Sequence, residues 1–395
     1  PGAQAMRSLR TNPALLYFLC ALCTAFLSFV QTPEASSQTQ ADWRQRWDKT
    51  LNAAKKEGRV VVWGPPGELI RQAMTREFNK AYPDITVEYS GARGGEQAVR
   101  IKAERDGGVY SVDVLLSGTT TAMIQMKPIG ALDPIEPALI LPEVTGTQHW
   151  RDHKLEFADP TTRTDLVFST MLKTPLIFNP KLATADQLDE LHELLDPRWK
   201  GKFVLNDPLP SGSGNVTFRW IWRVMGPEKA EDYYRKIRAN AAVADRDQRR
   251  QIEWVAQGKY AFLLAPSDGV LGQMLGRGLK LGIVPEFKDY GTYVTASFGS
   301  AMLINKAPHP NAVTVFLNWV LSKDGQTAWS KAMEHVSRRL DVPTDHLPSH
   351  TIPSPNAKFF SGEPKPGDRY WLSYTEENVK RSAEETKILK ELFGR

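Results

Sequence analysis

The feature of this sequence that most restricts its fold is the alternation of short apolar strands with helices along its first half. Apolar runs at 60–63, 85–89 and 112–116 have the length of buried strands, and the segments 69–82 and 96–105 have helical spacing. Strands separated by helices run parallel, and a parallel sheet is covered by helices on both faces. This half is therefore predicted to form an α/β lobe with a mostly parallel sheet.

A second alternation follows further along the chain. Strands are predicted near 203–205 and 260–264, with helices at 227–238 and 249–258 between them. Two longer extended segments enclose this part, 166–179 before it and 293–305 after it. Two crossings of the chain indicate two lobes joined by a hinge, and the cleft between such lobes is the natural place for a ligand.

The stretch 199–225 is the most informative part of the second lobe. It reads as a short strand, a loop with two prolines, a Ser/Gly-rich turn at 211–215 and an amphipathic helix rich in aromatic residues. The first amides of a helix lack partners within the helix and lie at the positive end of its dipole, so they can hold an anion. An ordinary Ser/Gly N-cap is the alternative interpretation.

The loops that follow the predicted strands supply the other candidate ligand-binding residues, because α/β sheets bind ligands where their strands end. Arg93 and Arg246 are included since a guanidinium holds carboxylate or phosphate in a fork. The alternative for Arg93 is a solvated surface arginine, and the alternative for Arg246 is simple neutralisation by Asp245 and Asp247. Trp63 could stack on a ligand or belong to the core. The complete set is Trp63, Gly64, Arg93, Gly94, Ser117, Gly118, Thr119, Ser211, Gly212, Ser213, Gly214, Arg246, Ser267 and Asp268.

The N-terminal segment is predicted to be a signal peptide, residues 1–37. Arg7 and Arg10 precede an apolar run at 14–30, and small residues follow at 35–37. A membrane anchor is the rival interpretation, but the run is short and no basic stop-transfer cluster follows it. Both cysteines lie inside this segment, so the exported chain is expected to have no disulfide or thiol site. The net charge of +5 is spread along the chain and does not indicate nucleic-acid binding.

Five stretches in a fixed order resemble the type II periplasmic solute-binding proteins of ABC importers, in the branch with iron(III), thiamine and phosphonate binders. They are VVVWG, FNKAYPDITVEYSGARGGEQAVRIKAERDGGVYSVDVLLSG, LLDPRWKGKFVLNDPLPSGSGN, VAQGKYAFLLAP and GSAMLINKAPHPNAV. The resemblance covers about residues 59–335. Iron(III) binders place two adjacent tyrosines in the loop after VAQGKYAFLL, where this chain has Ala265, Pro266, Ser267 and Asp268. That departure argues against the usual iron site.

Other candidate chemistry has weaker support in the sequence. Tyr233 and Tyr234 are neighbours on a predicted helix, so their side chains diverge and packing is favoured. His346 and His350 are separated by Pro348, which prevents the regular helix that would bring both to one metal ion. No serine has an evident histidine partner. We therefore expect no catalytic residue, no metal and no cofactor.

The resemblance implies a two-lobed type II periplasmic-binding-protein fold, each lobe a mostly parallel sheet flanked by helices, joined by two crossover strands. The predicted domains are a signal peptide at 1–37, an N-terminal helix at 38–58, a discontinuous first lobe at 59–165 and 296–335, a second lobe at 166–295, and a C-terminal strap and helix at 336–395. Within the last of these, a charged helix is predicted at 376–393. The predicted function is periplasmic capture of a small anionic solute by a monomer, for delivery to an ABC permease. A secreted enzyme acting on a small anionic compound and an iron(III) binder with ligands such as Tyr290 or Tyr293 are the alternatives.

Overall fold

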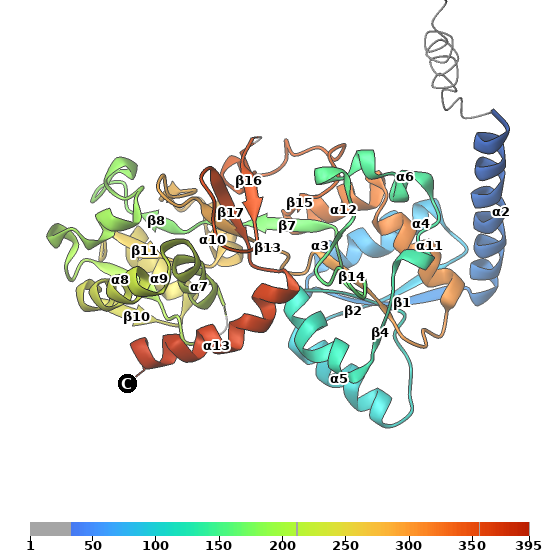
Figure 1. Ribbon diagram of the computed structural model, residues 1–395, viewed down its shortest axis with the longest axis horizontal. Helices are drawn as coiled ribbons and strands as arrows, with labels where there is room; N and C mark the ends of the chain where they lie inside the picture. Colours follow the sequence, from blue (N-terminus) through green and yellow to red (C-terminus); the bar gives the residue numbers. More distant parts are fainter. Residues whose placement is uncertain (1–32, 211, 355, 395) are drawn as a thin grey trace, which may run out of the picture. The chain divides into compact units, whose positions relative to one another are not determined.

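The computed structural model describes residues 33–210, 212–354 and 356–394 (Figure 1). Most of the predicted signal peptide therefore lies outside the described residues. The chain divides into two units, residues 1–48 and 49–395, and each is described by itself. Helix α2 (Pro33–Glu57) begins before the helix expected at 38–58 and ends one residue earlier. Within the described residues, no helix combines the length and apolar composition needed to cross a membrane.

The first lobe is built on a seven-stranded sheet in the order β2-β1-β3-β14-β6-β5, with β4 also paired to β14. Its strands are β1 (Arg59–Gly64), β2 (Thr86–Gly91), β3 (Val114–Ser117), β4 (Leu132–Asp133), β5 (Glu156–Phe157), β6 (Leu166–Val167) and β14 (Ser300–Ile304). The prediction of parallel pairing is confirmed for β1 with β2 and β3. It is wrong for the rest of this sheet, because the returning strand β14 enters antiparallel to β3, β4 and β6.

Helices cover this sheet as the alternation predicted. They are α3 (Glu68–Gln72), the π-helical η1 (Ala73–Glu77) and α4 (Phe78–Ala81) as one continuous segment, then α5 (Gly94–Asp106), η2 (Thr121–Met126), α11 (Pro310–Val320) and α12 (Lys323–Met333). Trp63, Ala98, Leu115 and Met302 come from different elements and pack in one buried core. Burial of these apolar side chains is what fixes α5 against the sheet.

The second lobe has a five-stranded sheet in the order β10-β9-β11-β8-β12. Its strands are β8 (Leu176–Phe178), β9 (Phe203–Asn206), β10 (Val243–Asp245), β11 (Phe262–Leu264) and β12 (Gly282–Val284), and its helices are α7 (Ser213–Met225), α8 (Pro227–Asn240), α9 (Gln248–Ala256) and α10 (Asp268–Gly276). Strand β9 is parallel to β10 and β11, whereas β8 is antiparallel to β11 and β12. The prediction of a mostly parallel sheet thus holds only for half of the pairings here, because β8 belongs to a crossing segment that enters from the other lobe.

A third sheet lies where the chain passes between the lobes, in the order β15-β7-β13-β17-β16. Its strands are β7 (Ser169–Leu172), β13 (Thr292–Thr295), β15 (Val336–Ser337), β16 (Lys358–Phe360) and β17 (Asp368–Leu372). Strands β7 and β13 are the two predicted crossovers and pair antiparallel. The expected run 293–305 is interrupted at Ser297, whose φ is 40°. Trp371 on β17 is fully buried, so the predicted C-terminal strap adds strands to the crossing sheet.

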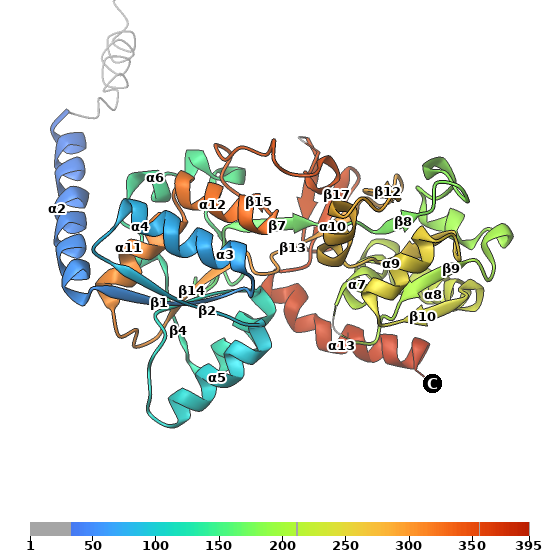
Figure 2. The ribbon, with the colours of Figure 1, turned by 180° about the vertical axis from the view of Figure 1, so that it is seen from behind.

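The remaining elements are short turns and one long terminal helix. The turns are η3 (Lys127–Ile129), η4 (Glu136–Ala138), α6 (Pro142–Thr145), η5 (Thr147–His149), η6 (Arg151–His153), η7 (Ala185–Gln187), η8 (Leu191–Leu195), η9 (Pro197–Trp199) and η10 (Ser349–Thr351). The long helix is α13 (Glu376–Phe393), with the bounds that the sequence predicted. Figure 2 shows it running from the first lobe to the second.

Candidate functional site

A cavity of about 340 Å³ lies between the two lobes. It is lined by Gly118, Thr119 and Thr120 from the first lobe, by Gly212, Ser213, Val216 and Arg219 from the second, by Lys173, Tyr293, Thr295, Ala296 and Ser297 from the crossing segments, and by Ser373, Tyr374, Val379 and Ser382 near the C-terminus. Larger hollows of about 910, 810 and 770 Å³ lie elsewhere, and none of these three is lined from both lobes. We place the candidate site in the cavity between the lobes because closure of a hinge acts there.

Four of the residues predicted from sequence meet in this cavity, namely Gly118, Thr119, Gly212 and Ser213. Gly118 directly follows strand β3 and lies where two segments of the chain approach each other closely. A Cβ atom at Gly118 would lie 2.2 Å from the carbonyl oxygen of Ser297. Only glycine therefore lets the first lobe contact the crossing segment at this point.

The start of α7 forms the wall contributed by the second lobe. Gly212 precedes the helix with φ 147° and ψ −165°, a conformation suited to glycine. The side-chain amide of Asn215 holds the turn by donating from Nδ2 to the Pro208 carbonyl at 3.0 Å. Among the described residues, no acceptor is found for the Ser213 and Gly214 amides, which as first-turn donors have no partner within the helix. Ser211, also predicted here, lies outside the described residues.

Lys173 brings a cationic head to the cavity. Its side chain is buried and pairs closely with the Asp268 carboxylate, which also accepts the Thr174 amide at 2.9 Å. Burial lowers the pKa of Lys173 to about 7, and the Asp268 carboxylate opposes that shift. Burial and the nearby Lys173 charge lower the pKa of His335 to about 4, so His335 is neutral at pH 7. Asp268, a predicted site residue, thus acts at the cavity through Lys173.

Arg219 and Tyr293 lie on the same wall. Arg219 Nε donates to Glu385 at 2.6 Å, and one of its terminal nitrogens donates to the Asn378 carbonyl at 2.6 Å. The Tyr293 hydroxyl lies 2.9 Å from the Thr217 hydroxyl and 3.3 Å from the Ser213 carbonyl. These contacts fix both side chains without a ligand, so this wall is preorganised.

Several predicted residues of the first lobe lie behind the cavity. Trp63 is 4% exposed in the core, and the Arg100 guanidinium lies 4.5 Å from its ring centre. Gly64 accepts a hydrogen bond from the Gln97 side chain at 2.6 Å. Ser117 is fully buried, and its hydroxyl has no partner among the described residues. A Cβ atom at Gly94 would lie 2.7 Å from that hydroxyl, so Gly94 permits the close packing of α5 on Ser117.

The two predicted arginines do not line the cavity. Arg93 is exposed at the N-cap of α5, and its amide donates to Glu96 at 3.3 Å. Arg246 is 74% exposed and pairs with Asp207 at 3.0 Å beside a separate hollow. The sequence suggested that a neighbouring aspartate neutralises Arg246, and the partner found here comes from the strand–loop junction before α7.

The other two predicted residues have structural surroundings. A Cβ atom at Gly214 would lie 2.5 Å from the Asp207 carbonyl, so this glycine allows α7 to start against the end of β9. Ser267 is the N-cap of α10, and its carbonyl accepts the Leu271 amide at 2.8 Å. Both shape the frame of the cavity and do not line it.

Sequence reasoning missed Lys173, Arg219 and the cavity residues of the C-terminal region. Lys173 lies inside a segment that was read only as a crossing strand, and its charge within an apolar run was the available signal. Arg219 shows the same signal inside the aromatic helix. Nothing in the sequence indicates that Val379 and Ser382 reach the cavity, because their helix looks like an ordinary charged surface helix.

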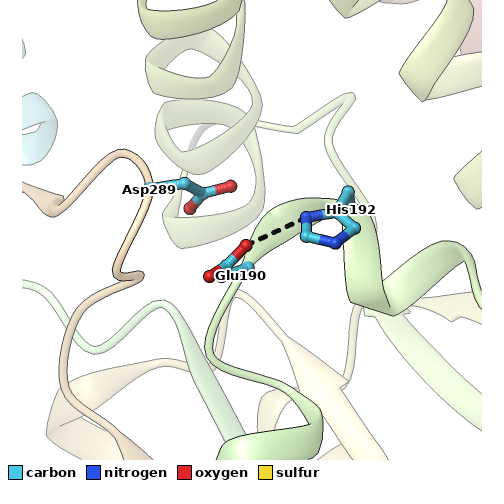
Figure 3. Close-up of side chains that lie close together, drawn as sticks. All are labelled: Glu190, His192 and Asp289. Carbon is cyan, nitrogen blue, oxygen red and sulfur yellow. Dashed lines mark ion pairs between the residues drawn. The ribbon is translucent and has the colours of Figure 1, made fainter.

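One group of side chains in the described part of the chain has the composition of a metal site. Glu190, His192 and Asp289 place their ligand atoms within 4.8 Å of one another on two loops of the second lobe (Figure 3). His192 Nδ1 lies 3.2 Å from Glu190, and Asp289 already accepts the Leu191 amide at 3.0 Å. His192 and Asp289 are exposed, and none of the three lines the cavity between the lobes. We therefore keep this group apart from the candidate site.

The tyrosines considered as metal ligands are protected from ionisation. Tyr233 and Tyr234 are buried in the core of the second lobe, in agreement with the packing interpretation. Burial raises the pKa of Tyr293, and it raises the pKa of Tyr374 to about 12.

A two-lobed α/β fold with a polar cavity at the crossing strands defines a protein that binds a solute between its lobes. The sequence model of the bacterial extracellular solute-binding protein family matches residues 63–327, and the chain belongs to that family. An uncharacterized protein of Haemophilus influenzae is 21% identical over 290 residues, which are 71% of this chain and 78% of that protein.

Solved structures of periplasmic binding proteins share the fold. The iron- and citrate-bound Trichodesmium protein named IdiA or FutA has a TM-score of 0.61 and 19% identity, covering 86% of this chain and 100% of that one. AfuA from Actinobacillus pleuropneumoniae, with fructose-6-phosphate bound, has a TM-score of 0.54 and 19% identity, covering 85% and 97%. The chain is thus a type II solute-binding protein of the ABC importer class, as the sequence resemblance implied. The family is one of bacterial extracellular solute-binding proteins, which implies export of the chain.

Proposed function

We propose that this protein captures a small anionic solute in the cavity between its lobes and delivers it to an ABC permease. The observation that carries the proposal is the donor set of the lining. The Ser213 amide, for which no acceptor is found among the described residues, the Lys173 ammonium and several hydroxyl-bearing residues belong to the lining of one cavity, and the described part of that lining includes no aspartate or glutamate. Helix-start amides and an ammonium together favour a phosphate, phosphonate or carboxylate group.

The volume of the cavity restricts the solute. A water molecule occupies about 30 Å³ in the liquid, so a cavity of about 340 Å³ holds on the order of ten non-hydrogen atoms. This lies at the lower end of the range for small-molecule sites. A compact organic anion fits this space.

The hydroxyl groups supply the remaining contacts. Thr119, Ser213 and Ser297 approach the cavity from three different segments of the chain, and a hydroxyl both donates and accepts. An anion that also carries hydroxyl or carbonyl groups would use this ring of contacts. Closure of the lobes would then bury the solute and strengthen each hydrogen bond by excluding water.

The test replaces both members of the buried Lys173–Asp268 ion pair, so that neither charge is left buried without its partner. The double variant Lys173→Met/Asp268→Asn removes the ammonium together with its carboxylate partner, and we expect at least a tenfold loss of affinity for the anions that bind. The matched control is Lys236→Met/Asp232→Asn, which neutralises an exposed pair on α8 whose atoms lie 2.5 Å apart. Binding is measured by calorimetry and by thermal shift with inorganic phosphate, methylphosphonate, a small carboxylate and a neutral hexose.

The outcomes test separately whether the solute is anionic and whether it binds in this cavity. Anion binding that is lost in the cavity variant and kept in the α8 control supports the proposal. Binding of the hexose alone would contradict the anionic character, and equal affinities in both double variants would contradict the site. Native mass spectrometry of the purified protein adds an independent observation, because a tightly held solute is retained.

Ferric salts provide the test against the iron-binding alternative. Because the chain has Ala265, Pro266, Ser267 and Asp268 where iron(III) binders have two adjacent tyrosines, we expect no visible charge-transfer band on adding iron(III) at neutral pH. A band that disappears in Tyr293→Phe would contradict the proposal and restore iron as the solute.

A further inference from the structure

Helix α13 contacts both lobes and lies along the cavity between them. Figure 1 shows its first turn beside the first lobe and its last turns beneath α7 and α8 of the second. Val379 and Ser382, one helical turn apart, line the cavity. The helix is therefore both a connection between the lobes and part of the wall of the proposed solute site.

The first-lobe end of α13 is held by a few contacts at its first turn. Glu376 pairs with Lys127 at 3.0 Å, and the Glu376 amide donates to the Ala158 carbonyl at 2.9 Å. Val379 packs in the core of the first lobe beside residues of η2, such as Met123. Lys127 and Glu376 are both partly exposed, so solvent reaches this ion pair.

The second-lobe end is held more firmly. Glu385 is buried between Arg219 at 2.6 Å and Arg223 at 3.1 Å. Leu389 and Phe393 belong to the large core of the second lobe. Buried charged hydrogen bonds and two core side chains hold this end, so the first turn of α13 is the end that separates more easily.

We propose that α13 is a brace between the lobes, and that its first turn must leave the first lobe before the cavity opens to solvent. Opening a hinge moves the Lys127 side of the first lobe away from α7. A helix fixed to α7 by Glu385, Leu389 and Phe393 cannot follow both lobes at once. The brace thus sets how readily the lobes separate, and its control of solute exchange rests on the proposed function of the cavity.

The experiment weakens the first-lobe contact of α13. Glu376→Gln removes the ion pair with Lys127 and a second pair within the helix, with Lys380 at 2.8 Å. Glu377→Gln is the matched control. Both substitutions remove one negative charge from the first turn of the same helix, but Glu377 pairs only within α13, with Arg381 at 3.4 Å. The loss of a negative charge near the positive end of the helix dipole is therefore the same in both variants.

Two measurements on the solute-free protein test whether α13 holds the lobes together. Hydrogen exchange follows the amides of residues 379–382. Pulsed electron spin resonance follows the distance between labels at Val99→Cys on α5 and Lys229→Cys on α8, both exposed sites, with Cys20 and Cys23 changed to serine. We expect Glu376→Gln to speed exchange at least about threefold and to add a population at longer distance. Glu377→Gln should match the wild type in both.

The outcomes are independent of solute identity. Equal exchange rates and equal distance distributions in the two variants would overturn the brace, whether or not phosphate binds to the cavity. A wild type that already shows a broad range of long distances would also overturn it. Conversely, a longer distance in Glu376→Gln alone supports the brace even if every anion fails to bind, an outcome that would count only against the proposed function.

Discussion

The buried carboxyl of Asp165 provides the sharpest stability prediction. Asp165 is fully buried in the first lobe, and neither of its carboxylate oxygens has a hydrogen-bond partner among the described residues. Burial, with a contribution from the negative charge of Asp159, raises the pKa of Asp165 to about 8, although Lys127 acts in the opposite direction. The Ser300 hydroxyl donates to the Ser117 carbonyl and so is not committed to this carboxyl. Asp165 is therefore protonated in the folded protein at neutral pH.

The sign of the pH dependence follows from this shift. In the unfolded chain the carboxyl ionises near its ordinary pKa of about 4, whereas in the folded protein it stays protonated up to about pH 8. The unfolded state therefore gains stability relative to the folded state as pH rises between these values. The loss is about 1.4 kcal/mol per pH unit, with an upper limit of roughly 6 kcal/mol over the whole window, and it ends above pH 8.

Asp165→Asn removes this titration while keeping the shape of the side chain. We expect the variant to be more stable than the wild type by a few kcal/mol at pH 8, and the difference to shrink toward pH 4. Urea unfolding at one-unit pH steps measures it. Asp159→Asn is the control with the opposite sign, since Asp159 accepts hydrogen bonds from Thr162, Thr164 and the Asp165 amide that lower its pKa. If wild type and Asp165→Asn show parallel pH profiles, the carboxyl is not protonated in the fold and the reasoning fails.

Three further predictions concern other buried positions. Gly118→Ala places a Cβ atom 2.2 Å from the Ser297 carbonyl, so we expect a loss of about 1–3 kcal/mol, seen as a lower melting temperature. The pKa of His335 is lower in the folded protein than in the unfolded chain, so the wild type should lose stability as pH falls from about 6.5 to about 4. His335→Gln should remove this loss, and acid unfolding profiles measure it. Glu385→Ala leaves the buried Arg219 without its partner, and urea unfolding should show a loss of about 3–5 kcal/mol.

The elements of this fold were largely predictable because their signals are local. Helix α13 was expected at the bounds that the structure shows, and the strands near β1, β9 and β11 coincide with apolar runs bounded by turn residues. Strand direction was less predictable. The antiparallel entry of β14 depends on where the chain returns from the second lobe, and that is a property of the whole topology, not of residues 300–304.

The candidate site was predictable only in part, for a similar reason. Gly118 and Ser213 follow predicted strands or precede a helix, so a general rule about strand ends finds them. Lys173 could be predicted as a site residue only with the knowledge that a crossing strand faces the cavity. Arg93 carries the right charge, but its place at the N-cap of α5 leaves it exposed and outside the lining. A loop arginine reveals its chemistry in sequence, whereas the direction of its side chain is set by packing.

The charges around the cavity occur in pairs, and this arrangement affects how an anion would bind. Lys173 is matched by Asp268, and Arg219 is matched by Glu385, so no cationic head in the lining is free of a carboxylate. An incoming anion therefore gains less from net charge than from the uncommitted amides of α7 and from hydroxyl groups. These donors are shielded from salt once the lobes close. Affinity for a bound anion should accordingly change little with ionic strength, in contrast to a site that relies on exposed arginines.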